Sequence, residues 1–398
     1  MLKGKKIVLG VTGGIAAYKA ADVASKLTQE GGDVKVIMTK AAAEFITPLT
    51  FEAVTGNAVI TDMFETSAEH RINHIALSEI ADVMLVAPAT ADIMAKIACG
   101  LADEMLSSTI LATHAPVILS PAMHTAMWEN PVTVENTEKL RKRGFYIIEP
   151  EQGRLASGGY GAGRFPDTRD IVGHVKKVLG AGGDLAGKRI LVTAGGTQES
   201  IDPVRIISNR SSGKMGYAIA EAARDRGAEV VLVTAPTALH RPAGIRVIEI
   251  ESAAEMKKAV DDEVKNTDAL IMAAAVADYQ PAAAADEKIK KSEDKLILEL
   301  VPTPDILGEI KTGIIKIGFA AESSNLVENA RRKLEKKKLD MIAANNIAAD
   351  TPVFNADTNE ITIISKDGKV EQLPLMSKAD AAEQILDRLT AIFQAISA

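Results

Sequence analysis

Short apolar runs alternate with amphipathic segments along the first half of the chain. Each run is bounded by glycine, proline or hydroxyl residues, which is typical of a buried strand. The Ala-rich segment 15–30 between the first two runs predicts a helix. An alternation of strand, short loop and helix favours a parallel sheet covered by helices. The predicted strands of this half are 5–11, 33–39, 83–87 and 116–119.

The second half begins with the same pattern and ends differently. After a first strand, the Gly195-Gly196 turn leads into a polar loop and then a helix that begins near Gly213. The loop spans about sixteen residues, far more than usual for a strand-to-helix connection. The tail predicts a β-hairpin followed by an amphipathic helix capped by Ser377. The later predicted strands are 229–233, 246–250, 269–274, 315–320 and 340–343, and the hairpin strands are 361–365 and 370–373.

A glycine-rich segment, GAGGDLAG at 180–187, separates the two patterns and is the best candidate for a linker. We place the boundary near Gly183, which gives domains at 1–183 and 184–398. The expected fold class is α/β. Each domain is expected to be a three-layer, Rossmann-like or flavodoxin-like domain with a mainly parallel sheet.

Composition and charge exclude several classes of protein. The chain has 398 residues, with 47% hydrophobic and 25% charged residues, as in ordinary globular proteins. The net charge of -7 argues against a nucleic-acid-binding protein. Cys99 is the single cysteine, so an intramolecular disulfide is excluded, and its Ala-rich surroundings predict a buried small residue. The apolar runs are too short to span a membrane, and the N-terminus does not resemble a signal peptide, so we expect a cytoplasmic protein.

A first candidate site follows the first strand, at the Gly13-Gly14 turn. A dinucleotide-binding turn would have the pattern G-x-G-x-x-G and an acidic residue at the end of the second strand. This chain departs from that pattern, because its second strand ends in Thr39. Backbone N–H groups at a helix start and a threonine hydroxyl suit a terminal phosphate monoester such as that of FMN. The alternative is a tight turn with a purely structural role.

A second candidate site is the polar loop of the second half. Long loops at the carboxyl ends of parallel strands are where open α/β sheets bind ligands. The loop contains residues that suit a phosphorylated, anionic ligand, namely Asp202, Arg205, Asn209, Arg210, Ser211, Ser212 and Lys214. The run at 211–216 lacks the spacing of a P-loop.

Two lysine-rich runs, 287–291 and 331–338, stand out in an acidic chain. Lys333 and Lys337 are four residues apart and therefore share one face of a helix. Together with Lys288 they could hold a triphosphate. The alternative is that both runs are solvated surfaces, as most such runs are.

The segment TAGGTQESIDPVRIISNRSSGKMG closely resembles the signature of phosphopantothenate-cysteine ligase. The later segments AAAVADYQP, EKIKK, TPDIL and IGFAAE resemble further motifs of that family, in the same order. The resemblance implies an acyl-nucleotide intermediate, CTP and Mg²⁺, with Arg205 and Asn209 acting on the activated acyl group. The implied substrate and nucleotide contacts are Ala274, Asp278, Lys288, Pro304, Asp305, Ile306, Leu307, Phe319, Lys333 and Lys337.

The first half resembles the flavin-dependent phosphopantothenoylcysteine decarboxylases through GVTGGIAAYK, RINHIALS, APATADIMAKIA and PAMHTAMW. The resemblance implies FMN as cofactor and His74 as the catalytic histidine, with Met123 and His124 at the substrate. Without it, His74 would be interpreted as a helix cap or a core histidine. The implied flavin contacts are Gly13, Gly14, Ile15, Ala16, Thr39, Pro88, Ala89 and Thr90.

Two residues depart from the decarboxylase pattern. His124 stands where the family often has asparagine, and Ser157 stands where many members have a proton-donating cysteine. After carbon dioxide leaves the oxidised substrate, a proton must be delivered to carbon, and a serine hydroxyl is a far weaker acid than a thiol. Three alternatives follow: Ser157 acts through water, Tyr160 or another group donates the proton, or the reaction stops at the enethiol.

The sequence therefore predicts a bifunctional enzyme of coenzyme A biosynthesis. It would ligate 4'-phosphopantothenate to cysteine with CTP, and then form 4'-phosphopantetheine by FMN-dependent decarboxylation. Two alternatives are an active ligase with a flavin-binding or oligomerisation module that lacks full decarboxylase activity, and a regulatory flavoprotein. The expected partners are the small-molecule substrates and further copies of the chain, with a trimer-based assembly of the first half and a dimer of the second.

Overall fold

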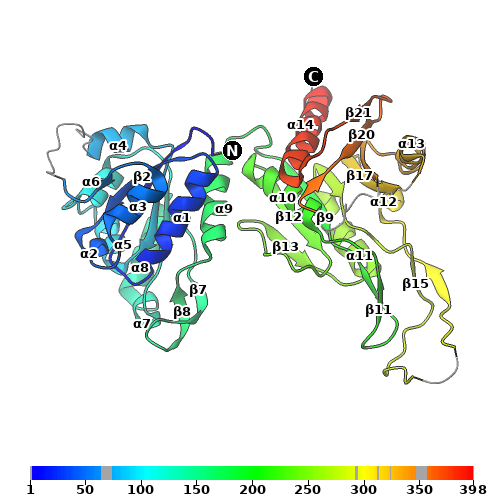
Figure 1. Ribbon diagram of the computed structural model, residues 1–398, viewed down its shortest axis with the longest axis horizontal. Helices are drawn as coiled ribbons and strands as arrows, with labels where there is room; N and C mark the ends of the chain where they lie inside the picture. The colour runs from blue at the N-terminus through cyan, green and yellow to red at the C-terminus, as the bar shows by residue number, and fades with distance from the viewer. Residues whose placement is uncertain are drawn as a thin grey trace. The chain divides into compact units, whose positions relative to one another are not determined.

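The computed structural model describes residues 2–63, 74–291, 295–311, 313–322, 324–346 and 356–397. The chain divides into two compact units, residues 1–179 and 180–398 (Figure 1). The division falls in the glycine-rich segment in which the sequence placed a linker. Both units are α/β structures with mainly parallel sheets, so the predicted fold class is confirmed.

Unit 1 is built on a parallel sheet with the strand order β3-β2-β1-β4-β5-β6. The chain moves outward from β1 to β3, and β4 then returns to the other side of β1. The strand order therefore reverses between β1 and β4, where open α/β sheets bind their ligands. The strands of this sheet are β1 Lys6–Val11, β2 Asp33–Met38, β3 Val59–Ile60, β4 Val83–Ala89, β5 Val117–Pro121 and β6 Tyr146–Ile147.

Helices cover both faces of this sheet. In β1, Ile7 and Leu9 face the layer that includes α1, α3 and α9, whereas Val8 faces the opposite layer with α5, α6 and α8. This alternation follows from the two-residue period of a strand. The helices of unit 1 are α1 Ala17–Gln29, α2 Lys40–Ala43, α3 Pro48–Thr55, α4 His74–Ile80, α5 Ala91–Cys99, α6 Met105–Ala112, α7 Thr125–Trp128, α8 Pro131–Lys142 and α9 Thr168–Gly180.

Two features of unit 1 were not predicted from the sequence. The segment around Ser157 is a β-hairpin of β7, Glu151–Arg154, and β8, Tyr160–Arg164. Cys99 is exposed, so its predicted burial is wrong. It is the last residue of α5, and Gly100 ends that helix in the left-handed conformation. The buried face of α5 carries Ile93, Met94, Ile97 and Ala98, which leaves Cys99 at the solvent side.

Unit 2 repeats the strand order of unit 1 and extends it. Its eight-stranded sheet has the order β13-β12-β9-β14-β17-β18-β20-β21, and the strands from β13 to β18 are parallel. The antiparallel β20 and β21 form the predicted C-terminal hairpin. The strands are β9 Arg189–Ala194, β12 Glu229–Thr234, β13 Arg246–Glu249, β14 Ala269–Met272, β17 Ile315–Glu322, β18 Met341–Asn346, β20 Ile361–Ser365 and β21 Val370–Gln372.

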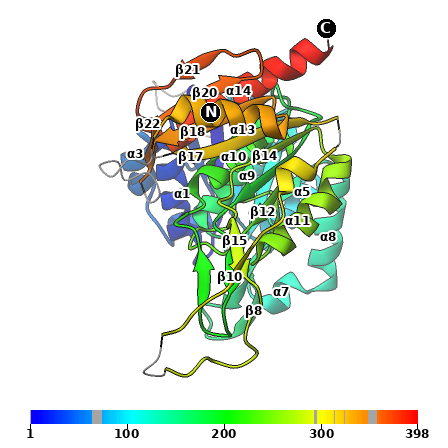
Figure 2. The ribbon, with the colours of Figure 1, turned by 90° about the vertical axis from the view of Figure 1, so that its right-hand side faces the viewer.

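One face of this sheet packs on α10 and α14, and the other packs on α11, α12 and α13 (Figures 1 and 2). Ser377 accepts a hydrogen bond from the backbone of Asp380, which confirms the predicted cap of α14. The helices are α10 Lys214–Asp225, α11 Ala253–Glu263, η1 Val264–Asn266, α12 Ile306–Glu309, α13 Leu326–Lys337 and α14 Lys378–Ser397.

Short two-stranded ribbons emerge from unit 2. The polar loop after β9 contains a short hairpin that the sequence did not predict. A second ribbon projects beside this hairpin in both views of Figures 1 and 2. The ribbon strands are β10 Gln198–Ser200 with β11 Ile206–Ser208, β15 Tyr279–Pro281 with β16 Leu300–Pro302, and β19 Thr358–Asn359 with β22 Met376–Ser377.

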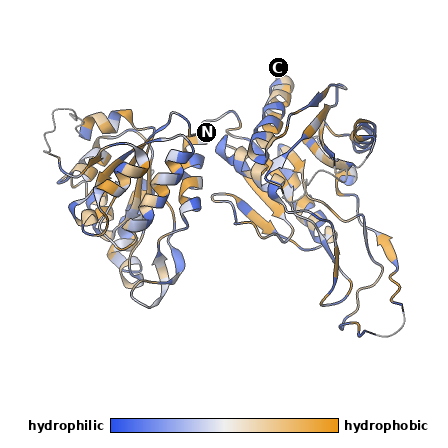
Figure 3. Ribbon diagram, viewed as in Figure 1, coloured by the Kyte–Doolittle hydropathy of each residue, from blue (hydrophilic) through white to orange (hydrophobic). Residues whose placement is uncertain are grey.

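The hydropathy of the chain follows these layers. Figure 3 shows apolar residues concentrated in the sheets and polar residues on the outer sides of many helices. Within the described residues, no helix has the length and apolar character that crossing a membrane requires.

Candidate functional sites

In unit 1, the loops after β1 and β4 are joined at the reversal of strand order. The buried Thr12 hydroxyl donates a hydrogen bond of 2.7 Å to the carbonyl oxygen of Pro88 and accepts one of 3.2 Å from the backbone of Thr90. Two segments of the predicted flavin site, the glycine turn and residues 88–90, are therefore fixed to each other.

The loop after β2 joins the same place. A Cβ atom on Gly13 would lie 2.4 Å from the Cβ of Ala41, and one on Gly14 would lie 3.8 Å from Cγ2 of Thr90. Only glycine at position 13 allows this approach, because real Cβ atoms do not come so close. Gly13, Gly14, Thr39 and Thr90 thus surround the carboxyl ends of three neighbouring strands.

Three helices begin at this edge. Thr39 and Thr90 cap α2 and α5 through their side-chain oxygens, whereas Ala16 at the start of α1 provides no side-chain cap. The first N–H groups of a helix need acceptors, and alanine is a poor N-cap. Gly13, Gly14 and Ala16 are half-buried and Ile15 is exposed, and their backbone N–H groups lie at the start of a helix that has no side-chain cap. A phosphate monoester such as that of FMN fits this donor set.

The β7–β8 hairpin is attached to the loop that carries the predicted substrate residues. The backbone N–H of Met123 donates to the carbonyl of Gly163 at 3.0 Å, and the Thr125 hydroxyl donates to that of Ala162 at 2.6 Å. Ser157 is exposed at the hairpin tip, and Tyr160 beside it is 80% exposed.

His124 caps the short helix α7. Its Nδ1 accepts a hydrogen bond of 3.2 Å from the backbone of Ala126, and its side chain is exposed. In a neutral imidazole with Nδ1 as the acceptor, Nε2 carries the proton. His124 can therefore donate one hydrogen bond to a carboxylate.

His74 lies elsewhere in unit 1. It is the half-buried first residue of α4, which packs on α6. Helix α4 ends three residues before β4 begins, at the amino edge of the sheet, whereas the glycine turn lies at the carboxyl edge. Figure 1 shows α4 at the upper end of the unit, with α2 and α7 at the lower end. A single copy does not bring His74 to the glycine turn.

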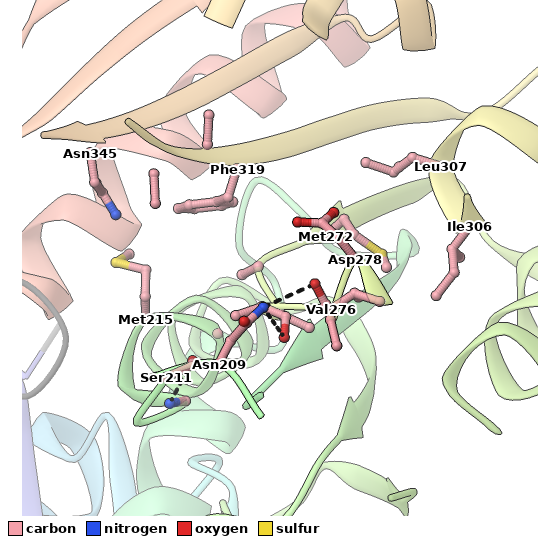
Figure 4. A pocket seen from close by; sticks show the side chains of 18 of the residues that line it. Asn209, Ser211, Met215, Met272, Val276, Asp278, Ile306, Leu307, Phe319 and Asn345 are labelled. Carbon is pink, nitrogen blue, oxygen red and sulfur yellow. Dashed lines mark hydrogen bonds between the residues drawn. The ribbon is translucent and has the colours of Figure 1, made fainter. Parts of the chain in front are cut away.

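In unit 2, a cavity of about 540 Å³ lies at the carboxyl edge of the sheet. Its walls come from β14, β17, β18 and the starts of α10, α12 and α14. Figure 4 shows Met215 and Asn345 at one end and Ile306 and Leu307 at the other. Ten of the predicted residues line the cavity, namely Asn209, Ala274, Asp278, Pro304, Asp305, Ile306, Leu307, Phe319, Lys333 and Lys337.

Asn209 lies between the two ends of the cavity. Its Nδ2 donates to the carbonyl oxygens of Ala275 at 3.4 Å and Val276 at 3.1 Å, as the dashed lines of Figure 4 show. These bonds connect the loop before α10 to the loop after β14. They fix the amide of Asn209 and leave its oxygen as an acceptor.

Lysines of α13 reach one end of the cavity. Lys333 donates to the carbonyl oxygen of Phe319 at 2.7 Å, and burial together with the charge of Lys337 lowers its pKa. Lys337 donates to Asp305 at 2.9 Å. Burial would raise the pKa of Asp305, but the bonds from Lys337 and from the backbone of Gly308 lower it below its ordinary value. A half-buried, partly uncompensated lysine favours an anionic ligand.

Two predicted residues, Arg205 and Lys288, do not line the cavity. The Arg205 guanidinium pairs with the buried Asp202 and donates to the carbonyl of Ile289 at 3.0 Å. The backbone of Ile289 donates to Asp202 at 3.1 Å. Arg205 therefore connects the β10–β11 hairpin to the lysine-rich run 287–291, and Lys288 is exposed in that run.

Among the cavity residues that the sequence prediction missed are Lys378, Asn345 and Asn359, and they line the cavity together with Lys214, which the prediction named in the polar loop. Lys214 is the first residue of α10, and Lys378 is the first residue of α14. A cation near a helix N-terminus costs about 0.3–1 kcal/mol, so a basic first residue is a usable signal for an anion site. Asn345 and Asn359 also line the cavity, and an asparagine in a sequence does not by itself indicate a ligand site.

Among the described residues, no group of three or more His, Cys, Asp and Glu side chains is arranged to hold a metal ion.

Two protein families match the chain. The family described as Flavoprotein matches residues 1–180, and the family described as DNA/pantothenate metabolism flavoprotein C-terminal domain matches residues 185–393. The Coenzyme A biosynthesis bifunctional protein CoaBC of Bacillus subtilis (strain 168) is 44% identical over 398 residues, which covers 98% of each chain.

Solved structures resemble parts of the chain. The C-terminal domain of a Coenzyme A biosynthesis bifunctional protein CoaBC is 44% identical and covers 53% of this chain and 98% of its own, with a TM-score of 0.46. The FMN-dependent cysteine decarboxylase SpaF is 32% identical and covers 43% of this chain and 95% of its own, with a TM-score of 0.39.

Proposed function

The chain belongs to the family of coenzyme A biosynthesis bifunctional proteins, and we propose that its two units catalyse two successive reactions. Unit 2 ligates 4'-phosphopantothenate to cysteine, and unit 1 decarboxylates the product to 4'-phosphopantetheine. The observation that carries the ligase half is the cavity of unit 2, in which Asn209 lies between two ends that both carry lysines.

The ligation begins with activation of a carboxylate, which is a poor electrophile. A carboxylate oxygen of 4'-phosphopantothenate attacks the α-phosphorus of CTP, and the bond to pyrophosphate breaks. The amino group of cysteine then attacks the acyl carbon of the acyl-cytidylate, CMP leaves with the bonding electrons, and the amine loses a proton. Both steps need positive charge at phosphate oxygens and precise placement of the acyl group.

The residues around the cavity suit these needs. Lys333 and Lys337 stabilise the phosphates of the nucleotide, whose base and ribose lie against Asp278, residues 304–307 and Phe319. Asn209, whose Nδ2 is held by two backbone carbonyls, presents its amide oxygen as an acceptor beside the activated acyl group. Lys288 reaches the nucleotide from the run that Arg205 holds in place. Mg²⁺ enters with the triphosphate, whose oxygens are its usual ligands.

In unit 1 we assign FMN to the carboxyl edge of the sheet. The N–H groups of residues 13–16 and the hydroxyl of Thr39 would hold its phosphate, and residues 88–90 would support its ring. When bound, FMN would supply the two-electron oxidation of the carbon next to the thiol and the return of those electrons after carbon dioxide has left. His124 donates a hydrogen bond from Nε2 to the substrate carboxylate, and Met123 contacts the substrate.

Ser157 occupies the hairpin tip at which the family often has the proton donor. Its exposure lets the hairpin deliver a proton through water, with Tyr160 as the second donor candidate. A complete reaction in this chain requires one of these two routes.

The position of His74 supports a homo-oligomer. Helix α4 has 7 residues and spans about 10 Å, whereas the 7-residue strand β4 spans about 23 Å. Since α4 ends at the amino edge, His74 stays roughly 10 Å or more short of the carboxyl edge of its own sheet. We therefore propose that His74 acts in the flavin site of a neighbouring copy, in a trimer-based assembly of unit 1.

For unit 2 we propose a dimer, and for the whole protein a cytoplasmic location beside its soluble substrates.

One incubation tests the proposal. The purified protein receives 4'-phosphopantothenate, cysteine, CTP and Mg²⁺, and the products are followed by mass. We expect 4'-phosphopantetheine, carbon dioxide, CMP and pyrophosphate. Parallel incubations with ATP in place of CTP, and with a chelator in place of Mg²⁺, test the nucleotide and the metal.

Other products would favour the alternatives. Accumulation of 4'-phosphopantothenoylcysteine without carbon dioxide would leave a ligase with a flavin-binding module that does not complete the decarboxylation. Absence of any nucleotide-dependent product would contradict both halves and favour a regulatory flavoprotein. The Asn209→Ala variant should lose ligation and keep the decarboxylation of added 4'-phosphopantothenoylcysteine, which separates the two activities.

A further inference from the structure

Lys316 is a buried lysine that lies outside the cavity of unit 2. The residues on either side of it in β17 pack against the layer of α10 and α14, so its own side chain is on the opposite face, with α11, α12 and α13. Lys316 is 7% exposed, and its ammonium donates to the backbone carbonyls of Lys337 at 3.0 Å and Ile310 at 3.4 Å. Burial lowers the pKa of Lys316, and the charge of Asp340 only partly offsets this. A buried charge is costly without partners, so the two carbonyls determine where this side chain lies.

The two carbonyls are at the ends of helices. Lys337 is the last residue of α13, and Ile310 directly follows α12. The last carbonyls of a helix have no partners within the helix and form the negative end of its dipole. The chain leaves α13 through Lys338 with a φ of +50°, which is uncommon for a residue other than glycine. The ammonium of Lys316 therefore stabilises a helix end of unfavourable conformation and joins it to the end of α12.

Helices α12 and α13 both line the end of the cavity to which we assign the nucleotide. Ile306 and Leu307 of α12 mark this end in Figure 4, and α13 provides Lys333, Lys336 and Lys337. The distance between the two helices therefore sets the width of this end and the position of its charges.

A second join between the two helices lies at the cavity itself. Asp305 directly precedes α12, and its Oδ1 accepts from the backbone of Gly308 at 3.1 Å and from the ammonium of Lys337 at 2.9 Å. The phosphates of a nucleotide would compete with Asp305 for Lys337, so a bound nucleotide weakens this join. The bonds of Lys316 lie outside the cavity and are not open to the same competition.

We propose that Lys316 is a positioning residue of the nucleotide site, which holds the end of α13 against α12 and thereby places Lys337 for the phosphates. The inference rests on the proposed ligase function and deepens it, because it adds a residue that acts on nucleotide binding without touching the nucleotide. A methionine at this position would have a similar length but would leave both carbonyls unpaired and release the end of α13. Nucleotide binding should then weaken, since Lys337 would have to be ordered at the moment of binding.

Steady-state kinetics of the full-length protein test this role. Pyrophosphate release is measured while CTP or 4'-phosphopantothenate is varied, with cysteine and Mg²⁺ in excess. In Lys316→Met we expect KM for CTP to rise by about fivefold or more, because the affected helix end carries a phosphate ligand. KM for 4'-phosphopantothenate and kcat should stay within about twofold of wild type. Lys316→Arg keeps the charge and the donors, and it should recover most of the affinity for CTP.

Equilibrium binding of CTP shows whether Lys316 acts through Lys337. In the Lys337→Gln background, Lys316→Met should change the affinity for CTP by less than about twofold, because the residue that it positions is already lost. Equal weakening in both backgrounds would contradict the proposed route. Lys366→Gln is the matched control, since Lys366 lies 3.5 Å from Asp340 but is 73% exposed, and it should leave both KM values unchanged.

The same variants separate positioning from stability. A lower Tm in Lys316→Met together with an unchanged affinity for CTP would overturn the inference and assign Lys316 to stability alone. If Lys316→Met does not fold, Lys316→Gln, which keeps one amide donor for a carbonyl, is used for the same comparison. A wild-type protein that binds CTP without ligation would reject the proposed function, while the binding comparison would still decide the role of Lys316.

Discussion

Asp202 is a buried carboxylate with both oxygens engaged. Oδ1 accepts from the backbones of Val204 and Arg205, each at 2.8 Å, and Oδ2 accepts from Ile289 and the Arg205 guanidinium. Burial alone would raise its pKa, but these N–H groups and the charge of Arg205 lower the pKa to about 2. The charge of Asp202 therefore holds the β10–β11 hairpin against the run 287–291.

Removal of this charge tests its role. In Asp202→Asn, the Nδ2 side cannot accept hydrogen bonds, so we expect faster amide exchange at residues 198–208 and 287–291 at neutral pH. Since the folded-state pKa lies below the ordinary 3.8, the stabilisation is complete above that value and is lost as the pH falls from 3.8 to about 2. The difference in Tm between wild type and variant should shrink over the same range. Asp262→Asn, at an exposed position, serves as the charge control, and equal melting of all three proteins at neutral pH would contradict the assignment.

Gly13 gives a second prediction at the scale of one residue. In Gly13→Ala, the new Cβ would lie 2.4 Å from the Cβ and 2.8 Å from the backbone carbon of Ala41, so the two loops must separate. Such overpacking typically costs about 1–3 kcal/mol. We expect the variant to purify with little flavin, measured by its visible absorbance. Gly182→Ala, where a Cβ meets no atom within 4 Å, should keep the flavin content of wild type. Full flavin content in Gly13→Ala would place the cofactor elsewhere.

The sequence predicted those candidate site residues that act through their backbone or that belong to a recognisable motif. The Gly13-Gly14 turn and Thr39 follow from strand and helix patterns, because parallel strands end at one edge. The pair of Arg205 with Asp202 was not predictable, since burial of Asp202 depends on tertiary packing of a distant segment. Lys214 and Lys378 are more than 160 residues apart, and only the packing of α10 on α14 brings them into one cavity.

At the scale of elements, strands and helices with strong periodicity were predicted well, and ribbons were not. Strand β9 and helix α10 match the apolar pattern, whereas β10 and β11 have three residues each and too few alternations to be recognised. The hairpin of β7 and β8 was missed because its sequence is rich in glycine, which weakens any strand signal. Those glycines have a packing role instead.

Gly163 is where the β7–β8 hairpin meets the loop before α7. Its φ of +124° and the position of its hypothetical Cβ, 2.2 Å from the carbonyl oxygen of Met123, exclude any larger residue. In Gly163→Ala, the hairpin must move away from Met123 and His124. We expect carbon dioxide release from 4'-phosphopantothenoylcysteine to fall by about tenfold or more, because misplacement by about 1 Å can cost a hundredfold. Pyrophosphate release by unit 2 should stay at the wild-type rate, and a parallel loss of both activities would indicate general misfolding instead.

At the scale of the whole molecule, two units with the same strand order serve two different chemistries. Each sheet reverses its order next to its first strand, β1 in unit 1 and β9 in unit 2, and each candidate site lies at the carboxyl edge beside that strand. The sheet order was not available from the sequence, because the apolar pattern shows which segments are strands and does not show which strands are neighbours. The two units differ in the elements attached to their sheets. Unit 1 carries a glycine-rich hairpin, whereas unit 2 carries ribbons and helices with lysines at the candidate site.

The position of His74 gives the last prediction. If His74 serves a neighbouring copy, His74→Asn and Gly13→Ala damage different halves of a shared site. Coexpression of the two inactive variants should then restore about a quarter of the wild-type decarboxylation, since one pairing in four joins an intact turn with an intact histidine. Each variant alone should keep pyrophosphate release, because unit 2 is unchanged. A site contained within one copy predicts no recovery in the mixed protein at any ratio, so carbon dioxide release from the coexpressed variants decides between the two arrangements.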